Sequence, residues 1–61
     1  MEVKQIVKFY RDAKTVNDIV SVIIQADKHL NINSNNIYYS KYTKRELINI
    51  ATEKIIKIVR L

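Results

Sequence analysis

The sequence contains no glycine, proline, cysteine or tryptophan, and it has a single histidine. Without cysteine there is no disulfide framework, no thiolate nucleophile and no thiolate zinc site. Without glycine the chain cannot form a glycine-rich phosphate loop. With His29 alone, the usual sets of zinc ligands cannot be assembled from one chain. We therefore expect no metal ion and no other cofactor.

A length of 61 residues leaves room for one small domain, which we expect to span residues 1–61. The first residues lack the apolar core and the small-residue cleavage site of a signal peptide. The longest apolar run, from Ile19 to Ile24, is interrupted by Ser21 and is far shorter than the ~20 residues needed to cross a bilayer. These features predict a cytoplasmic protein without membrane contact.

Two capping boxes mark the starts of helices. In each, a threonine is followed three residues later by an acidic residue, as in Thr15 with Asp18 and Thr43 with Glu46. Apolar residues then recur at the spacing of a helix, so the pattern predicts helices over 16–30 and 44–61. The spacing of Val3, Ile6, Val7 and Tyr10 favours a further helix over 2–13, although residues 2–10 also alternate acceptably for a strand.

Between the second and third predicted helices the sequence has turn character. The asparagine-rich segment 31–36 is typical of a loop, because asparagine tolerates the left-handed conformation that glycine would otherwise supply. Residues 37–42 are the one segment with strand character, and a lone strand needs a partner from the N-terminal segment or from a second chain. The predicted fold class is therefore all-α, a small three-helix domain with a possible short strand near 37–42.

The inventory of side chains argues against an enzyme. His29 falls at the predicted C-terminal end of a helix, where an imidazolium favours the negative end of the helix dipole. Asp12, Asp18 and Asp27 do not have the spacing of a calcium-binding loop. We accordingly predict that the chain has no catalytic residues.

Asp27 and Lys54 are charged residues on faces that are otherwise apolar. A carboxylate at position 27 is costly unless it is paired or reaches water. One interpretation is an ion pair that sets the register between helices or between subunits. The other is that Asp27 lies near enough to the helix end to be solvated, while Lys54 rests its aliphatic stem on the core.

The apolar arcs of the second and third predicted helices are wider than a one-sided surface helix needs. Ile56 in addition lies on the polar face of its helix. A chain of this size has little core in which to cover so much apolar surface, so we predict a homodimer. The predicted interface residues are Ile24, Leu47, Ile50, Ile55, Ile56, Ile58 and Val59.

The net charge is +5, and the cations fall into two clusters. One is a stripe along the first predicted helix, and the other interleaves cations with tyrosines that could stack on bases. Lysine or arginine supplies charge for phosphates, and amides at a helix start supply geometry. The predicted nucleic-acid-binding residues are Lys4, Lys8, Arg11, Tyr38, Tyr39, Lys41, Tyr42, Lys44 and Arg45.

The leading hypothesis from the sequence is a small, basic, non-enzymatic helical dimer that binds DNA or RNA. Isoleucine, lysine, asparagine and tyrosine are abundant and share adenine- and thymine-rich codons, so we expect an AT-rich source such as a phage, virus or other mobile element. The protein would act there as a regulator or accessory protein, in the host cytoplasm if viral. The alternative is a protein-binding inhibitor or adaptor, such as a phage-type inhibitor of a host enzyme or defence complex.

Overall fold

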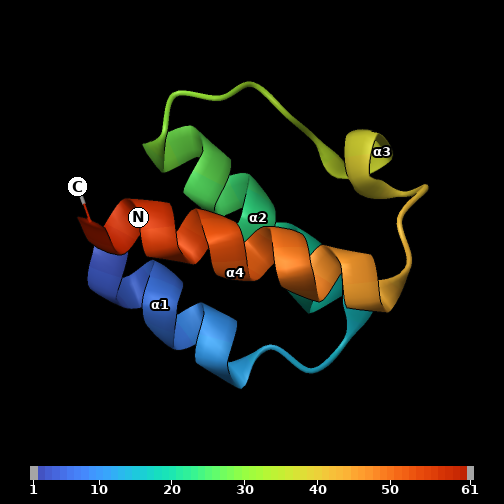
Figure 1. Cartoon of the computed structure of the whole chain (residues 1–61), viewed down its shortest axis with the longest axis horizontal. Coiled ribbons are helices and arrows are strands. Elements are labelled where there is room, and N and C mark those ends of the chain that lie inside the picture. Colours follow the sequence, from blue (N-terminus) through green and yellow to red (C-terminus); the bar gives the residue numbers. More distant parts are fainter. Residues whose placement is uncertain (1, 61) are drawn as a thin grey trace.

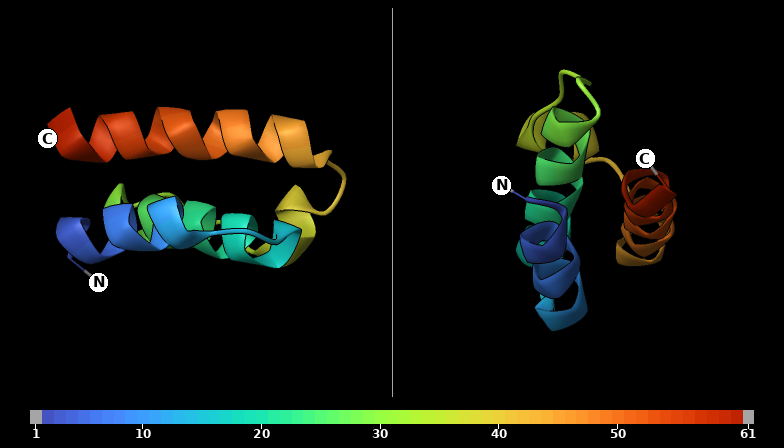
Figure 2. Two further views of the ribbon diagram at one scale, coloured as in Figure 1. Left: turned by 90° about the horizontal axis from the view of Figure 1, so that it is seen from below. Right: turned by 90° about the vertical axis from the view of Figure 1, so that its left-hand side faces the viewer.

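The computed structural model describes residues 2–60, and over this range the chain is all-helical. The helices are α1 (Val3–Asp12), α2 (Val16–His29), α3 (Asn36–Tyr39) and α4 (Lys44–Arg60) (Figure 1). Figure 2 shows that α1 and α2 form one layer and that α4 lies across it as a second layer. The three long helices confirm the predicted helices to within one residue at each end, with Glu2, Ala13 and Leu30 as caps outside them, while residue 61 lies outside the described residues.

The helix starts follow from their capping residues. Thr15 Oγ1 accepts a hydrogen bond from the Asp18 amide at 3.1 Å, and Thr43 Oγ1 accepts one from the Glu46 amide at 3.2 Å. In return Asp18 Oδ2 accepts from the Thr15 amide and Glu46 Oε1 from the Thr43 amide, so both predicted capping boxes are confirmed. Within residues 2–60, no helix has both the length and the apolar character needed to span a membrane.

The strand considered for residues 37–42 is wrong, because the segment starts with a helical turn. Asn35 Oδ1 accepts from the Tyr38 amide at 3.2 Å and caps α3. Ser40 Oγ closes the turn by donating to the Ile37 carbonyl. The preceding segment behaves as predicted, since Asn31 has a φ of 62° and supplies the left-handed residue after α2.

The core forms on both sides of α2, which explains its wide apolar arc. One cluster packs α2 against the α3 turn and the first half of α4; it contains Ile19, Val20, Ile23, Tyr39, Leu47 and Ala51. The other packs α2 against α1 and the second half of α4; it contains Ile6, Val22, Ala26, Ile55 and Ile58. Because α4 contacts both α1 and α2, its apolar arc is also largely filled within one chain.

This packing corrects part of the predicted dimer interface. Leu47, Ile55 and Ile58 are buried in the core of the single chain, so they are not available to a second copy in this fold. Ile24 and Ile50 are partly buried against the core. Of the predicted interface residues, Ile56 and Val59 are the ones that remain exposed, at 46% and 60% of their surface.

Asp27 has no exposed surface, and three side chains satisfy its carboxylate. Lys54 from α4 forms an ion pair with Oδ1, while Tyr39 from α3 donates to Oδ2 at 2.6 Å. Ser34 from the loop also donates to Oδ2. The paired interpretation of Asp27 and Lys54 is thus confirmed, and the pair lies between helices of one chain.

The shifted pKa values of this network follow from its burial and charge. Burial raises the pKa of the Tyr39 hydroxyl, and its hydrogen bond to the Asp27 carboxylate raises it further. Burial alone would lower the pKa of the Lys54 ammonium, but the hydrogen bond and the charge of Asp27 outweigh that effect and raise it. Both shifts favour the state in which Tyr39 is neutral and Lys54 is charged.

Replacing Lys54 tests how strongly the core depends on this pair. Lys54→Met should reduce the free energy of unfolding by about 3–5 kcal/mol, because Asp27 is left buried and without a countercharge. The double variant Asp27→Leu/Lys54→Met should regain part of that loss, since an apolar pair has no charge to compensate, whereas the Ser34 and Tyr39 hydroxyls still lose their acceptor. Urea denaturation followed by circular dichroism measures both effects.

Lys57→Met is the matched control, because Lys57 is an exposed lysine on the same helix. It should change the unfolding free energy by less than about 0.5 kcal/mol. An equally small effect of Lys54→Met would show that the pair does not stabilise the fold.

Candidate nucleic-acid interface

Three cations from separate segments surround one cavity at the end of the bundle where α1 finishes and α2 and α4 begin. The cavity has a volume of about 380 Å³. Arg11, Lys14 and Lys44 line it together with four other residues, which are Tyr10, Ala13, Ile19 and Ile48. We call this cavity the basic hollow. No carboxylate lines it among the described residues.

The paths of the helices explain why these cations meet. Ala13 and Lys14 follow the last turn of α1, and the chain then turns directly into α2 at Val16. Figure 1 shows that α4 begins at the same end of the molecule as α2. Lys44, the first residue of α4, is therefore brought beside residues that precede it by about thirty positions in the sequence.

The structure places the predicted basic residues unequally. Arg11 and Lys44, one from each predicted cluster, line the basic hollow. Lys4 and Lys8 are exposed and continue the stripe along α1, at the helical spacing that ends in Arg11. Lys41 and Arg45 are also exposed, but they do not line the hollow; they flank Lys44 in the sequence.

The three tyrosines predicted to bind nucleic acid differ in how far their side chains are exposed. Tyr39 is only 3% exposed and donates to Asp27, so its predicted role as an exposed stacking residue is wrong. Tyr42 is partly buried against the core, and Tyr38 is exposed. The Lys41 ammonium lies 5.9 Å from the Tyr38 ring centroid and 5.6 Å from the Tyr42 ring centroid. The Lys41 ammonium is therefore within cation–π distance of both rings.

The capping box occupies one of the amides at the start of α4. The Glu46 amide donates to Thr43 Oγ1, and the Glu46 carboxylate accepts from the Thr43 amide. That hydrogen bond lowers the pKa of Glu46 and keeps a negative charge at the helix start. An anion at this end would therefore meet the Glu46 carboxylate as well as the lysine and arginine side chains.

The carboxylate of Asp18, near the hollow, also accepts hydrogen bonds from the backbone at a helix start. Asp18 Oδ2 accepts from the backbone amides of Lys14 and Thr15, each at 3.3 Å. These bonds lower the pKa of Asp18 and orient its carboxylate towards the backbone. The Lys14 ammonium makes no ion pair among the described residues.

Lys14 is the cation that the sequence did not identify. It lies between two helices, where no helical periodicity relates it to other residues. The apolar residues of the hollow were also missed, because Tyr10 and Ala13 have ordinary places on a core-facing helix. The hollow exists only in the folded chain, where α4 lies beside the end of α1, so no local sequence pattern indicates it.

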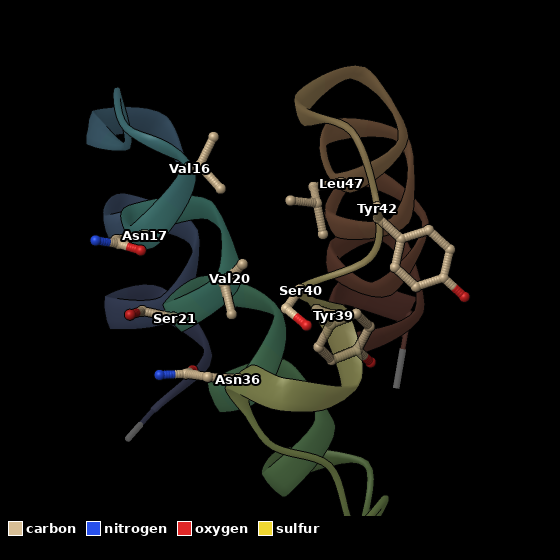
Figure 3. A pocket seen from close by; sticks show the side chains of 9 residues that line it. All are labelled: Val16, Asn17, Val20, Ser21, Asn36, Tyr39, Ser40, Tyr42 and Leu47. Atoms are coloured by element: carbon tan, nitrogen blue, oxygen red, sulfur yellow. The ribbon is translucent and has the colours of Figure 1, made fainter.

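A second cavity differs from the basic hollow in having no charged lining. It has a volume of about 330 Å³ and lies between the first half of α2 and the segment that joins α3 to α4. Figure 3 shows Val16, Val20 and Leu47 facing the space between the helices, whereas the Asn17 side chain lies along its outer edge. This cavity can take apolar groups but offers no charge to an anionic ligand.

The chain matches no model of a protein family, and comparisons with curated proteins and with solved structures also find no match.

Removing one cation from the basic hollow should stabilise the free protein. Arg11, Lys14 and Lys44 repel one another, and Lys44 in addition lies at the positive end of the α4 dipole. Lys44→Gln and Lys14→Gln should each raise the free energy of unfolding by about 0.2–0.5 kcal/mol in low salt. Thermal unfolding at about 20 mM and 500 mM salt should show the gain fade, because a short Debye length screens the repulsion.

Lys57→Gln is the control for this measurement, since Lys57 lies in the last turn of α4, away from the hollow. Loss of stability in both hollow variants, at either salt concentration, would mean that the cations make favourable contacts and do not repel one another.

Proposed function

We propose that this chain is a small, non-enzymatic nucleic-acid-binding protein that contacts phosphates through the basic hollow and the adjoining stripe on α1. The observation that carries the proposal is the meeting of Arg11, Lys14 and Lys44 around one cavity without a lining carboxylate. A cluster of cations from separate segments is the electrostatic footprint expected of a phosphate-binding surface.

The surrounding charges support the same function. Lys4 and Lys8 are exposed and continue along α1 at helical spacing from Arg11, and the exposed Arg45 follows Lys44 directly in α4. The sum of these residues accounts for most of the positive charge of the chain, whose net value is +5. The proposed role is that of a cytoplasmic regulator or accessory protein of a virus, phage or other mobile element.

A homodimer remains part of the proposal. Ile56 and Val59 lie near the C-terminal end of α4 and are exposed, whereas the basic hollow lies at the opposite end, near Lys44. Association through Ile56 and Val59 would leave the basic hollow of each copy free. Two copies would then present two separated clusters of cations to one nucleic acid and raise the apparent affinity.

Protein binding is the second candidate, and one observation favours it. Ile37 is 82% exposed, and Tyr38 beside it is 57% exposed, which is unusual for large apolar side chains on one turn. The uncharged cavity next to α3 could receive an apolar anchor from a partner protein. An inhibitor or adaptor would use this side of the molecule and would depend little on the cations of the basic hollow.

Alanine substitution of the hollow tests the nucleic-acid proposal. The triple variant Arg11→Ala/Lys14→Ala/Lys44→Ala should weaken binding to DNA and reduce the slope of log affinity against log salt by up to about three units per chain, because each lost phosphate contact releases no counterion. Fluorescence anisotropy with labelled oligonucleotides between about 50 and 200 mM salt measures the slope.

The control removes exposed cations from other surfaces, with Lys28→Ala and Lys57→Ala as the substitutions. These should lower the affinity slightly, through net charge, and leave the hollow contacts intact. Absence of binding by the wild-type protein to duplex DNA, single-stranded DNA and RNA at low salt would overturn the proposal. In that case Tyr38→Ala, tested against captured protein partners, examines the second candidate.

A further inference from the structure

We infer that the basic hollow holds the base of one unpaired nucleotide, so that the protein prefers single-stranded nucleic acid to duplex. This inference rests on the proposed function and adds the form of nucleic acid that is bound. It follows from the uncharged residues of the hollow, which a surface for phosphates alone would not need.

The lining of the hollow combines two kinds of chemistry. Arg11, Lys14 and Lys44 supply positive charge, whereas Tyr10, Ala13, Ile19 and Ile48 supply apolar surface. A nucleotide is complementary to both parts of this lining. Its phosphate is anionic, and its flat base packs against apolar and aromatic groups. The volume of about 380 Å³ lies within the range of about 300–1,000 Å³ found for small-ligand pockets, so one base fits without a change of the fold.

The Tyr10 ring is held in place by a short chain of hydrogen bonds. Thr52 Oγ1 donates to the Ile48 carbonyl at 2.8 Å, which uses the only hydrogen of that hydroxyl. The Tyr10 hydroxyl, 2.7 Å from Thr52 Oγ1, must therefore be the donor in their hydrogen bond. The polar end of the tyrosine is satisfied by α4, and its ring remains as a fixed wall of the hollow.

The same geometry disfavours a duplex. In a double helix the bases are stacked and paired, and only the phosphates and the groove edges can be reached by a convex helical surface. A single strand can place one base in the hollow while its neighbouring phosphates lie against Arg11, Lys14 and Lys44. Exposed Ile48 would then be covered on binding, since 41% of its surface is exposed in the free protein.

The first test compares two single strands of equal length and charge, one with bases and one without, and a duplex of the same length on the wild-type protein. A labelled 12-nucleotide thymidine strand should bind about tenfold more tightly than a 12-nucleotide strand with abasic sites throughout its centre, because the phosphates are kept and the bases are removed. A 12-base-pair duplex should bind less tightly than the thymidine strand at equal salt, although it carries about twice as many phosphates. Fluorescence anisotropy gives the three dissociation constants.

The second test uses a pair of matched isoleucine variants. Ile48→Asn makes the hollow polar without changing its charge, and it should weaken binding to the thymidine strand about tenfold while leaving duplex binding unchanged. Ile32→Asn changes an isoleucine of similar exposure, 44% against 41%, that neither lines the hollow nor belongs to the proposed dimer interface, and it should leave both affinities unchanged. Circular dichroism confirms that each variant is folded; if Ile48→Asn is not, the abasic comparison on the wild-type protein decides.

The outcomes separate this inference from the function on which it rests. Equal affinity for the thymidine, abasic and duplex probes, with binding still lost in the triple alanine variant, would overturn the inference and leave the nucleic-acid function intact. The inference would also be overturned if Ile48→Asn and Ile32→Asn weakened single-strand binding equally. No binding of any probe would overturn both.

Discussion

The buried carboxylate of Asp27 is the constraint on which the arrangement of this small chain depends. It lies on α2 with no exposed surface, and its donors come from the loop, from α3 and from α4. No buried side-chain nitrogen or oxygen among residues 2–60 lacks a hydrogen-bond partner, so the network is complete. Because a buried charge without partners is costly, helix packings that separate Lys54 from Asp27 are disfavoured. The ion pair thereby fixes α4 against α2, and with it the position of Lys44.

The basic hollow is a consequence of that arrangement. Its cations belong to the end of α1, to the turn before α2 and to the start of α4, and Lys44 approaches the other two only when the helices are packed. Carboxylates are present at the same end, but capping bonds engage Asp18 and Glu46 with the backbone. The capping boxes thus start the helices and hold these two carboxylates against backbone amides, and neither carboxylate lines the hollow.

Local sequence patterns predicted the features that residues close in the sequence determine. These include the starts of α2 and α4 and the left-handed conformation of Asn31. Contacts between distant residues could not be read in the same way. Tyr39 resembles an exposed tyrosine of a basic segment, because its hydrogen-bond acceptor lies twelve positions earlier on another helix. The wide apolar arc of α4 suggested a second copy, whereas α1 and α2 fill most of it in one chain. Lys14 lines the hollow only because the tertiary structure brings α4 beside it, so the sequence did not indicate its place in the site.

The most direct test of the central role of Asp27 is the mobility of residues 31–43 when the carboxylate and its countercharge are removed together. In the Asp27→Leu/Lys54→Met variant, Ser34 and Tyr39 lose their acceptor while the packing volume is largely kept. Nitrogen-15 relaxation should show order parameters of residues 36–39 falling below about 0.6, while those of α1, α2 and α4 stay near 0.85. Order parameters of residues 36–39 equal to those of the wild-type protein would contradict the account.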